Sequence, residues 1–253
     1  MQSHYSYQAA DDLLKGRIIL VTGAGDGIGR AAALGFADKG ATVVLLGRTI
    51  SKLEAVYDEI EARGAEKPAI YPLNFEGATW PDYKEMADRL YEEFGRLDGV
   101  LHNAGILGQI TPLQGYNPEL WHEVMQINFS GPTMMLQALI PLLQQSQDAS
   151  VILTSSSVGR KGRAFWGAYA CSKFALEGLS QVMSEELENI SQVRVNTLNP
   201  GATRTKMRAK AYPGENPNTL PTPEEILPVY YYLMGPDSQG ITGQQFDAQP
   251  PKS

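Results

Sequence analysis

Short apolar runs rich in β-branched residues alternate along this chain with segments of helical composition. The runs are separated by helix-forming segments such as 30–40 and 51–64, and they occupy residues 17–24, 41–48, 68–74, 97–105, 149–157 and 193–201. Strands that are apolar throughout and separated by helices form a parallel sheet covered on both faces. With right-handed crossovers, this order predicts an α/β fold, a single-domain Rossmann-like doubly wound parallel sheet with helices on both faces.

The length of the chain agrees with one domain. Its 253 residues suit a single dinucleotide-binding and catalytic unit over 1–253. We expect residues 1–15 to form an N-terminal extension. The segment 207–225 contains four prolines and begins with charged residues, so we expect it to be irregular and to act as a substrate loop.

Charge and cysteine content exclude several classes of partner. A net charge of −7 leaves no basic excess for nucleic acid or for an anionic membrane surface. The single cysteine, Cys171, permits no intrachain disulfide and fits a reducing compartment. We recognise no signal peptide at the start and no apolar stretch long enough to span a membrane. The expectation is a cytoplasmic protein without membrane or nucleic-acid partners.

The first apolar run ends in a glycine-rich turn, TGAGDGIG, at residues 22–29. Glycines make the turn tight and let the backbone approach a pyrophosphate, and the N-terminus of the next helix offers free N–H groups. Such a turn also occurs as an ordinary connection between a strand and a helix. Its position after the first strand favours dinucleotide binding.

Six motifs then occur in one order along nearly the whole chain: TGAGDGIG, HNAG at 102–105, Asn128 in QINFSG, Ser156 in TSSSVG, YACSK at 169–173 and NPGATRT at 199–205. Together they resemble the short-chain dehydrogenase/reductase family in its compact branch. The segments DGVLHNAGILG, SSSVGRKGRAFWGAYACSKFA and FDAQP further resemble one bacterial subgroup of oxidoreductases. The resemblance implies a nicotinamide-dependent oxidoreductase that acts on a small carbonyl or alcohol substrate, assembled as a homodimer or homotetramer.

The resemblance also implies a catalytic set of four side chains. Tyr169 is the expected acid/base, and Ser156 orients and polarises the substrate oxygen. Asn128 is expected to hold a water on a proton path through Lys173, although it could be an ordinary amide inside a helix. The serines on either side of Ser156 remain alternatives to it.

Tyr169 and Lys173 lie four residues apart, which places them one turn apart on the same face of a helix. Alone, such a pair could be an ordinary surface pair. A free tyrosine has a pKa of about 10. A cation about 4 Å away, at an effective dielectric constant of about 20, lowers that pKa by up to about three units. We therefore expect Lys173, with the positive ring of an oxidised nicotinamide, to bring the pKa of Tyr169 near neutral pH.

The cofactor contacts carry over from the family in the same way. His102 replaces the first asparagine of the family's NNAG strand end, and we interpret it as a core residue without a catalytic role. The expected cofactor-binding residues are Gly23, Gly25, Asp26, Gly27, Ile28, Gly29, Arg48, Asn74, Asn103, Ala104, Gly105, Tyr169, Lys173, Pro200, Gly201, Thr203 and Thr205.

The end of the second apolar run bears on the choice of nicotinamide cofactor. An acid about 20 residues beyond the glycines would bind the ribose of NAD. Gly47 and Arg48 stand there instead, and an arginine can pair with the 2′-phosphate of NADP. Asp26 counts against this, since some NADP-preferring members carry a basic residue in the glycine loop. We expect NADP(H), with NAD(H) as the alternative.

Other patterns leave alternatives open. Arg160, Lys161 and Arg163 could attract an anionic or polar substrate, or could form a solvated turn. No spacing of His, Cys and Asp predicts a metal site. Besides an oxidoreductase, the sequence is compatible with a dinucleotide-binding regulator that has lost its chemistry, and with an epimerase or dehydratase on the same fold. The latter enzymes usually carry a larger C-terminal substrate domain.

Overall fold

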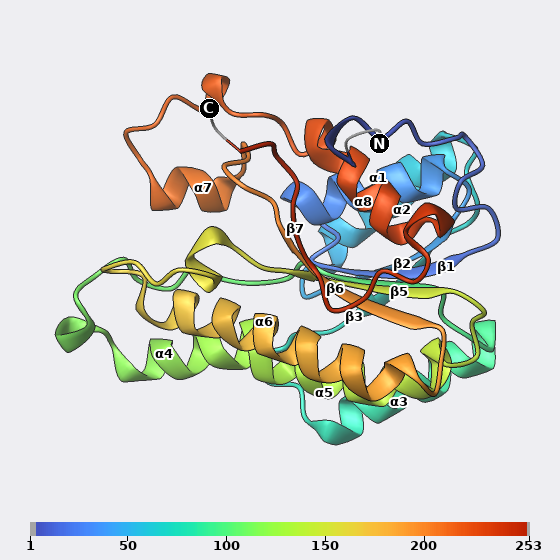
Figure 1. Cartoon of the computed structure of the whole chain (residues 1–253), viewed down its shortest axis with the longest axis horizontal. Helices are drawn as coiled ribbons and strands as arrows, with labels where there is room; N and C mark the ends of the chain where they lie inside the picture. The colour runs from blue at the N-terminus through green and yellow to red at the C-terminus, as the bar shows by residue number, and fades with distance from the viewer. Residues whose placement is uncertain (1–3, 252–253) are drawn as a thin grey trace.

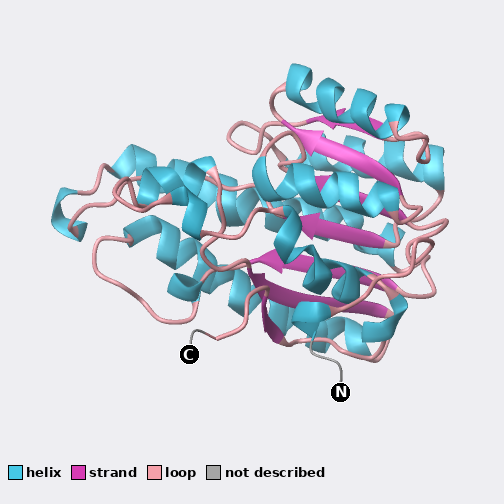
Figure 2. Ribbon diagram, turned by 90° about the horizontal axis from the view of Figure 1, so that it is seen from above, coloured by secondary structure: helices cyan, strands magenta, loops and turns pink. Residues whose placement is uncertain are grey.

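One parallel sheet forms the centre of the molecule (Figures 1 and 2). The computed structural model describes residues 4–251, and in this range the sheet has seven strands in the order β3-β2-β1-β4-β5-β6-β7. The strands are β1 (Ile18–Thr22), β2 (Thr42–Gly47), β3 (Ala69–Pro72), β4 (Gly99–His102), β5 (Ala149–Thr154), β6 (Val193–Asn199) and β7 (Gln245–Asp247). The predicted α/β fold class is therefore confirmed.

Helices cover both faces of this sheet, as Figure 1 shows. One face carries α1 (Gly27–Asp38), α2 (Ile50–Ala62) and α8 (Leu227–Met234). The opposite face carries α3 (Trp80–Phe94), α5 (Gly131–Leu143) and α6 (Gly167–Glu188). The short helices α4 (Pro118–Met125) and α7 (Lys206–Ala211) lie at the side of the molecule toward which the strands of Figure 2 point.

The mainly apolar runs follow from this double coverage. Successive side chains of a strand point to opposite faces. In β1, Ile19 and Val21 pack into the core below α1, α2 and α8, whereas Ile18 and Leu20 pack into the core of the other face. Four of its five residues are therefore apolar, and all five, with Thr22 at the carboxyl end, are buried.

The strand order places a crevice at the carboxyl ends of the central strands. β1 pairs with β2 on one side and with β4 on the other, so the direction of strand succession reverses between β1 and β4. Ligands of such sheets bind beyond the carboxyl ends of the strands at this reversal. The glycine-rich turn after β1 and the ends of β4 and β5 meet there.

Two segments differ from their expected structure. The segment 207–225, expected to be irregular, contains most of α7 and short 3₁₀ turns at Pro217–Thr219 and Glu224–Ile226. β7 is not apparent from the sequence because it has three residues and none of them is fully buried. It is nevertheless paired in parallel with β6.

The described part of the predicted N-terminal extension packs against the domain. Leu14 is fully buried, and the ring of His4 lies 5.6 Å from that of Phe246 in β7. None of the helices within residues 4–251 is long and apolar enough to cross a membrane.

Candidate active site

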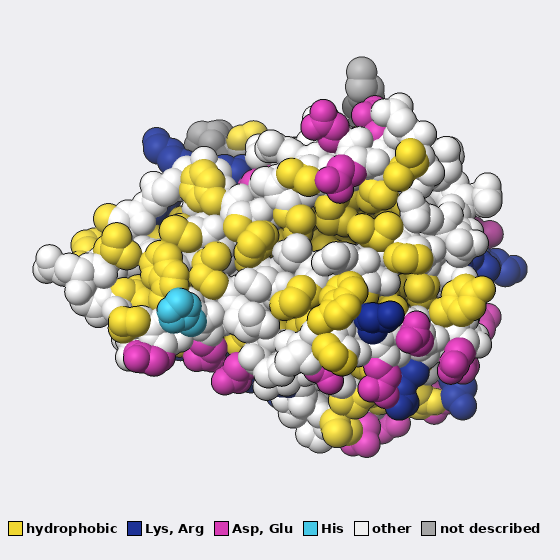
Figure 3. Space-filling view, turned by 90° about the horizontal axis from the view of Figure 1, so that it is seen from below, with side chains coloured by type: hydrophobic (Ala, Val, Ile, Leu, Met, Phe, Trp, Pro, Cys, Tyr) yellow, Lys and Arg dark blue, Asp and Glu magenta, His cyan; other side chains and the backbone are white. Residues whose placement is uncertain are grey.

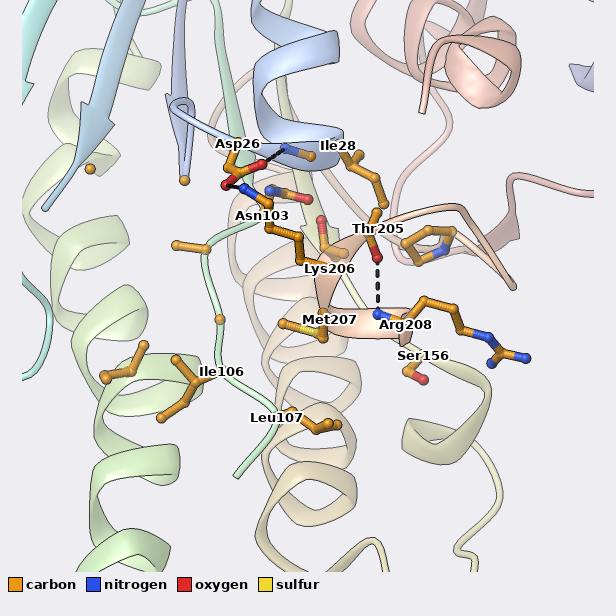
Figure 4. Close-up of a pocket in the computed structure, with 18 of the residues that line it drawn as sticks. Asp26, Ile28, Asn103, Ile106, Leu107, Ser156, Thr205, Lys206, Met207 and Arg208 are labelled. Atoms are coloured by element: carbon orange, nitrogen blue, oxygen red, sulfur yellow. Dashed lines mark hydrogen bonds and ion pairs between the residues drawn. The ribbon is translucent and has the colours of Figure 1, made fainter. Parts of the chain in front are cut away.

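A cleft of about 530 Å³ opens at the carboxyl ends of the strands. It is lined by the glycine-rich turn, the ends of β2, β4 and β5, the start of α6 and the segment 199–212 (Figure 4). Of the residues predicted for catalysis or cofactor binding, only Gly29 and Asn128 do not line this cleft. The structure thus brings together residues from all six sequence motifs.

Three glycines of the glycine-rich turn stand where another residue would be strained or would clash. Gly23 and Gly27 have φ values of +68° and +53°, in the left-handed region that favours glycine. A Cβ atom on Gly29 would lie 2.3 Å from the carbonyl oxygen of Gly23, so Gly29 serves the packing of the turn behind the cleft. The free N–H groups at the start of α1 consequently face the cleft, where they can bind phosphate oxygens.

Asp26, within this turn, is neutralised by two lysines. Its Oδ1 accepts a hydrogen bond from the N–H of Gly27 at 2.9 Å and caps α1. Its Oδ2 accepts from Lys52 Nζ at 2.6 Å and from Lys206 Nζ at 2.9 Å. These hydrogen bonds hold the pKa of Asp26 at about 2. The acid that counted against NADP is thus balanced by two cations, and the local charge is positive.

Arg48 stands at the same end of the cleft. Its side chain is exposed, and within the described residues it makes no ion pair or side-chain hydrogen bond. It follows β2 directly, and Lys52 is one turn further along α2. An exposed guanidinium that no carboxylate engages is suited to pair with a phosphate.

The end of β4 is fixed by one hydroxyl. Thr22 Oγ1 accepts the N–H groups of Asn103 and Ala104, both at 3.0 Å. Its hydrogen is therefore free to be donated to His102 Nδ1, 3.2 Å away, which places the imidazole proton on Nε2. Burial, with the charge of Lys173, lowers the pKa of His102 to about 3. His102 is thus a buried neutral residue at the strand end, in agreement with its interpretation as a core histidine.

Asn128 lies behind the cleft, in a π-helical turn at Gln126–Ser130. Its Oδ1 accepts from the N–H of Ile106 at 2.8 Å, and its Nδ2 donates to the carbonyl of Ile106 at 2.9 Å and to Ser172 Oγ at 3.1 Å. The amide side chain thus fastens the segment after β4 to α6. Single-turn π-helices are frequent at functional sites. The position of Asn128 in such a turn therefore favours a functional role over that of an ordinary amide inside a helix.

Tyr169 and Lys173 occupy the first turns of α6, as the sequence predicts. Lys173 Nζ lies 5.6 Å from the centroid of the Tyr169 ring and donates to the carbonyl of Thr154 at 2.7 Å. The hydroxyl of Ser156 is near enough to that of Tyr169 to lower the pKa of the phenol. Acid/base, serine and lysine therefore converge on one end of the cleft.

The protonation of this group differs from the expectation. Burial raises the pKa of Tyr169 to about 12, and only the hydroxyl of Ser156 acts in the opposite direction. Lys173 does not lower that pKa, since its ammonium is turned toward the carbonyl of Thr154. Burial also lowers the pKa of Lys173 to about 8. In this arrangement Tyr169 keeps its proton, and the lowering of its pKa by Lys173 together with a bound oxidised nicotinamide stays a prediction.

The structure distinguishes the three neighbouring serines. Ser155 is buried and donates to Glu177, while Ser157 is exposed and does not line the cleft. Only Ser156 both lines the cleft and contacts Tyr169. The assignment of Ser156 from its motif is supported by this geometry.

Arg160 does not face the cleft. It pairs with Glu177 at 3.0 Å and with Asp247 of β7 at 3.1 Å. Glu177 is buried and also accepts from Thr197 at 2.7 Å. The suggested attraction of an anionic substrate by Arg160 is therefore wrong, because its charge is used inside the protein. No motif marks this network, since Glu177 looks like any acid of a helix.

Trp166 and Tyr212 are lining residues that no motif marks. Phe165, just before Trp166, has a φ of +76°, and its carbonyl accepts the N–H of Thr111 at 3.1 Å. Non-glycine residues in this region are strained and cluster at functional sites. The turn directs Trp166 into the cleft at the start of α6.

Other positions agree with the motif assignments. Gly201 has a φ of +73°, and the segment around it is braced by Gln249, whose Nε2 donates to the carbonyl of Pro200 at 2.9 Å. Thr205 caps α7 by accepting from the N–H of Arg208. No group of three or more potential metal ligands lies together in residues 4–251.

Comparison with known proteins identifies the family. Residues 17–216 match the family model described as short chain dehydrogenase. The chain is 51% identical over 244 residues to the uncharacterized oxidoreductase YciK of Escherichia coli strain K12, with 96% of each chain covered. The predicted resemblance to a bacterial subgroup is confirmed, and that subgroup is the YciK-like one.

Solved structures give the same result. A protein of Pseudomonas syringae has a TM-score of 0.95 at 57% identity, over 96% of this chain and 99% of that one. A protein of Shigella flexneri 2a strain 301, complexed with NADP, has a TM-score of 0.93 at 51% identity, over 95% of this chain and 100% of that one. With its motif residues gathered in one cleft, this chain belongs to the short-chain dehydrogenase/reductase family of oxidoreductases.

Proposed function

We propose that this chain is an NADP(H)-dependent carbonyl reductase or alcohol dehydrogenase in which Tyr169 is the acid/base. The observation that carries the proposal is the convergence of Tyr169, Ser156 and Lys173 at one end of a cleft whose other end presents Arg48. A donor of protons and a site for a phosphate thus share one cavity.

The residues of the cleft fit NADP(H). Gly25 and Gly27 of the glycine-rich turn line the cleft and carry no side chain, so a pyrophosphate can approach the backbone at the start of α1. Arg48 is available for the 2′-phosphate, and Asp26 does not repel it because two lysines engage its carboxylate. The NADP complex of the Shigella protein supports the same choice. NAD(H) is the alternative.

The chain's own residues would act as follows. The bound nicotinamide supplies the hydride that adds to the carbonyl carbon. Ser156 holds the carbonyl oxygen, and Tyr169 donates its proton to that oxygen as the alcohol forms. Because its pKa is raised to about 12, Tyr169 is protonated at neutral pH, which is the form that a reduction requires. Lys173 and Asn128 would hold the ribose and the proton path behind it.

A panel of aldehydes and ketones tests the proposal by the consumption of NADPH. One NADPH should be consumed for each alcohol formed, and Tyr169→Phe, which keeps the ring, should abolish the consumption while still binding NADPH. Binding without consumption would instead indicate a regulator. Conversion of a substrate without net consumption of NADPH would indicate an epimerase or dehydratase.

We also propose that the chain forms a homodimer or homotetramer in the cytoplasm. Figure 3 shows hydrophobic side chains gathered on the helical face of α3 to α6, and Phe174 and Val182 of α6 are 44% and 53% exposed. Cys171 is a free, exposed thiol, which fits a reducing compartment. Light scattering of wild type and of Phe174→Glu tests the assembly, since a monomeric wild type would contradict it.

A further inference from the structure

Three aromatic rings follow one another at the substrate end of the cleft. The ring of Trp166 lies 5.7 Å from that of Tyr169 and 5.9 Å from that of Tyr212, measured between centroids. All three residues line the cleft. Tyr212 comes directly after α7, so tertiary structure brings it to the start of α6. We call Trp166 and Tyr212 the aromatic wall.

The ring of Tyr212 is held in place from two directions. The guanidinium carbon of Arg208 lies 3.7 Å from the centroid of its ring, and Arg163 donates to its hydroxyl at 3.3 Å. A side chain that is already fixed loses little freedom when a ligand packs against it. The aromatic wall is therefore a prepared surface.

Apolar side chains line much of the rest of this end of the cleft. Ile106, Leu107, Met207 and Ala211 line it, and Figure 4 shows Ile106 and Leu107 across from Ser156. The polar groups that face a substrate here are the hydroxyls of Ser156 and Tyr169, which are matched to one carbonyl oxygen.

Among the described residues, the cations that line this end of the cleft are all engaged by groups of the protein, and Arg163, which donates to the Tyr212 hydroxyl, does not line the cleft. Arg208 lines the cleft, but its guanidinium donates to both carboxylate oxygens of Glu215, at 2.6 and 2.7 Å. Lys206 is paired with Asp26, and Lys173 is 3% exposed. A carboxylate or phosphate on the substrate near its carbonyl would lose water without gaining a partner.

We propose that the substrate class of this cleft is an uncharged aromatic aldehyde or ketone, whose ring packs on the aromatic wall while its carbonyl oxygen meets Ser156 and Tyr169. The inference rests on the proposed function and narrows it. Aromatic rings favour aromatic partners in tilted or offset contact beyond the area that they bury. A saturated ring of the same size would fill the space but would lack this contact.

Matched aldehydes test the aromatic part. Phenylacetaldehyde and cyclohexylacetaldehyde carry their carbonyl one methylene from the ring, so both carbonyls have similar reactivity. We expect kcat/KM with NADPH to be about two- to tenfold higher for the phenyl compound. Tyr212→Leu should remove this preference and Tyr212→Phe should keep it. Tyr91→Leu, an exposed tyrosine on α3, is the control and should change neither rate.

A second pair tests charge. Methyl 3-(4-formylphenyl)propanoate should be reduced at least about tenfold more efficiently than 3-(4-formylphenyl)propanoate, whose two methylenes insulate the carbonyl from the carboxylate, because that carboxylate finds no free cation lining the cleft. Glu215→Gln should narrow this ratio by releasing Arg208. An equal or reversed ratio in wild type, or an equal rate for the phenyl and cyclohexyl compounds, would overturn the inference.

Binding without chemistry separates the two proposals. Calorimetric titration of the NADP complex measures the affinities for 2-phenylethanol and 2-cyclohexylethanol, which differ in whether the ring is aromatic or saturated. A preference for the phenyl alcohol with no reduction of any aldehyde would refute the proposed function alone. Reduction of the aldehydes with no preference in either assay would refute the substrate class alone.

Discussion

The carboxylate of Asp26 and the ammonium of Lys206, 180 residues apart in sequence, form an ion pair of 2.9 Å at the mouth of the cleft. The pair joins the glycine-rich turn to α7, and Lys52 engages the same oxygen of Asp26. It therefore connects the segment expected to bind pyrophosphate with the segment that carries Tyr212. In Figure 4 the side chain of Lys206 reaches from α7 toward Asp26.

Lys206→Ala should loosen α7. Lys206 is largely exposed, so salt weakens the pair and its effect is small. We expect hydrogen exchange of residues 207–212 to become up to about fivefold faster, and bound NADPH to reduce the difference. Lys210→Ala, an exposed lysine of the same helix, is the matched control. Identical exchange in both variants would show that the pair does not hold α7.

Tyr169→Phe should lower turnover at least about 10²-fold, because the ring remains while the proton donor is lost. Affinity for NADPH should change little, since the phenyl ring still packs beside Trp166. Steady-state kinetics on a confirmed substrate, with calorimetry of NADPH, measure both quantities. Full turnover in the variant would remove Tyr169 from the mechanism.

Affinity for NADPH should depend on the protonation of Lys173. Its pKa is lowered to about 8, so the side chain is charged at pH 7 and neutral at pH 9. Charge-assisted hydrogen bonds are stronger than neutral ones, and we expect the affinity to fall about fivefold over this interval. Lys173→Met should bind weakly at both pH values. If the affinity for NADPH changed with pH in the same way in wild type and in Lys173→Met, the role of Lys173 would be contradicted.

Arg48 should decide between NADPH and NADH. Loss of one partly exposed, charge-assisted contact costs roughly 1.5–3 kcal/mol, or about 10- to 150-fold in affinity. We expect wild type to prefer NADPH at least about tenfold, Arg48→Ala to lose this preference, and Gly47→Asp to favour NADH. Calorimetric titration of both cofactors checks the prediction. Equal affinity in wild type would overturn the NADP assignment and leave the oxidoreductase family unaffected.

His102 should make the fold sensitive to acid. Its pKa is about 3 when folded and 6.5 when exposed, so only the unfolded chain binds this proton as the pH falls below about 6.5. The free energy of unfolding should then decrease by up to about 1.4 kcal/mol per pH unit from this residue. Denaturant unfolding at several pH values between 7 and 4.5 measures this free energy. It should decrease less steeply with falling pH in His102→Asn than in wild type. His122→Asn, at an exposed position of α4, should match wild type.

The order of strands and helices could be predicted because it is written in local pattern. A strand buried on both faces needs a mainly apolar run, and β1 and β5 show one that is interrupted only by Thr22, Ser150 and Thr154. The positions of Tyr169 and Lys173 on one face of α6 follow from helical spacing in the same way. β7 escaped prediction because three residues carry too little pattern, and its place depends on pairing with β6.

The properties of the site were decided by tertiary structure. Asp26 looked unfavourable for NADP until Lys52 and Lys206, from two other segments, were found on its carboxylate. The pKa of Tyr169 depends on how deeply α6 buries it and on where the ammonium of Lys173 turns, and neither is a property of spacing. The sequence by itself determined which groups meet, because motifs at strand ends converge at one edge of a parallel sheet. Only the folded chain determined their charges and contacts, because burial and ion pairing depend on neighbours far apart in sequence.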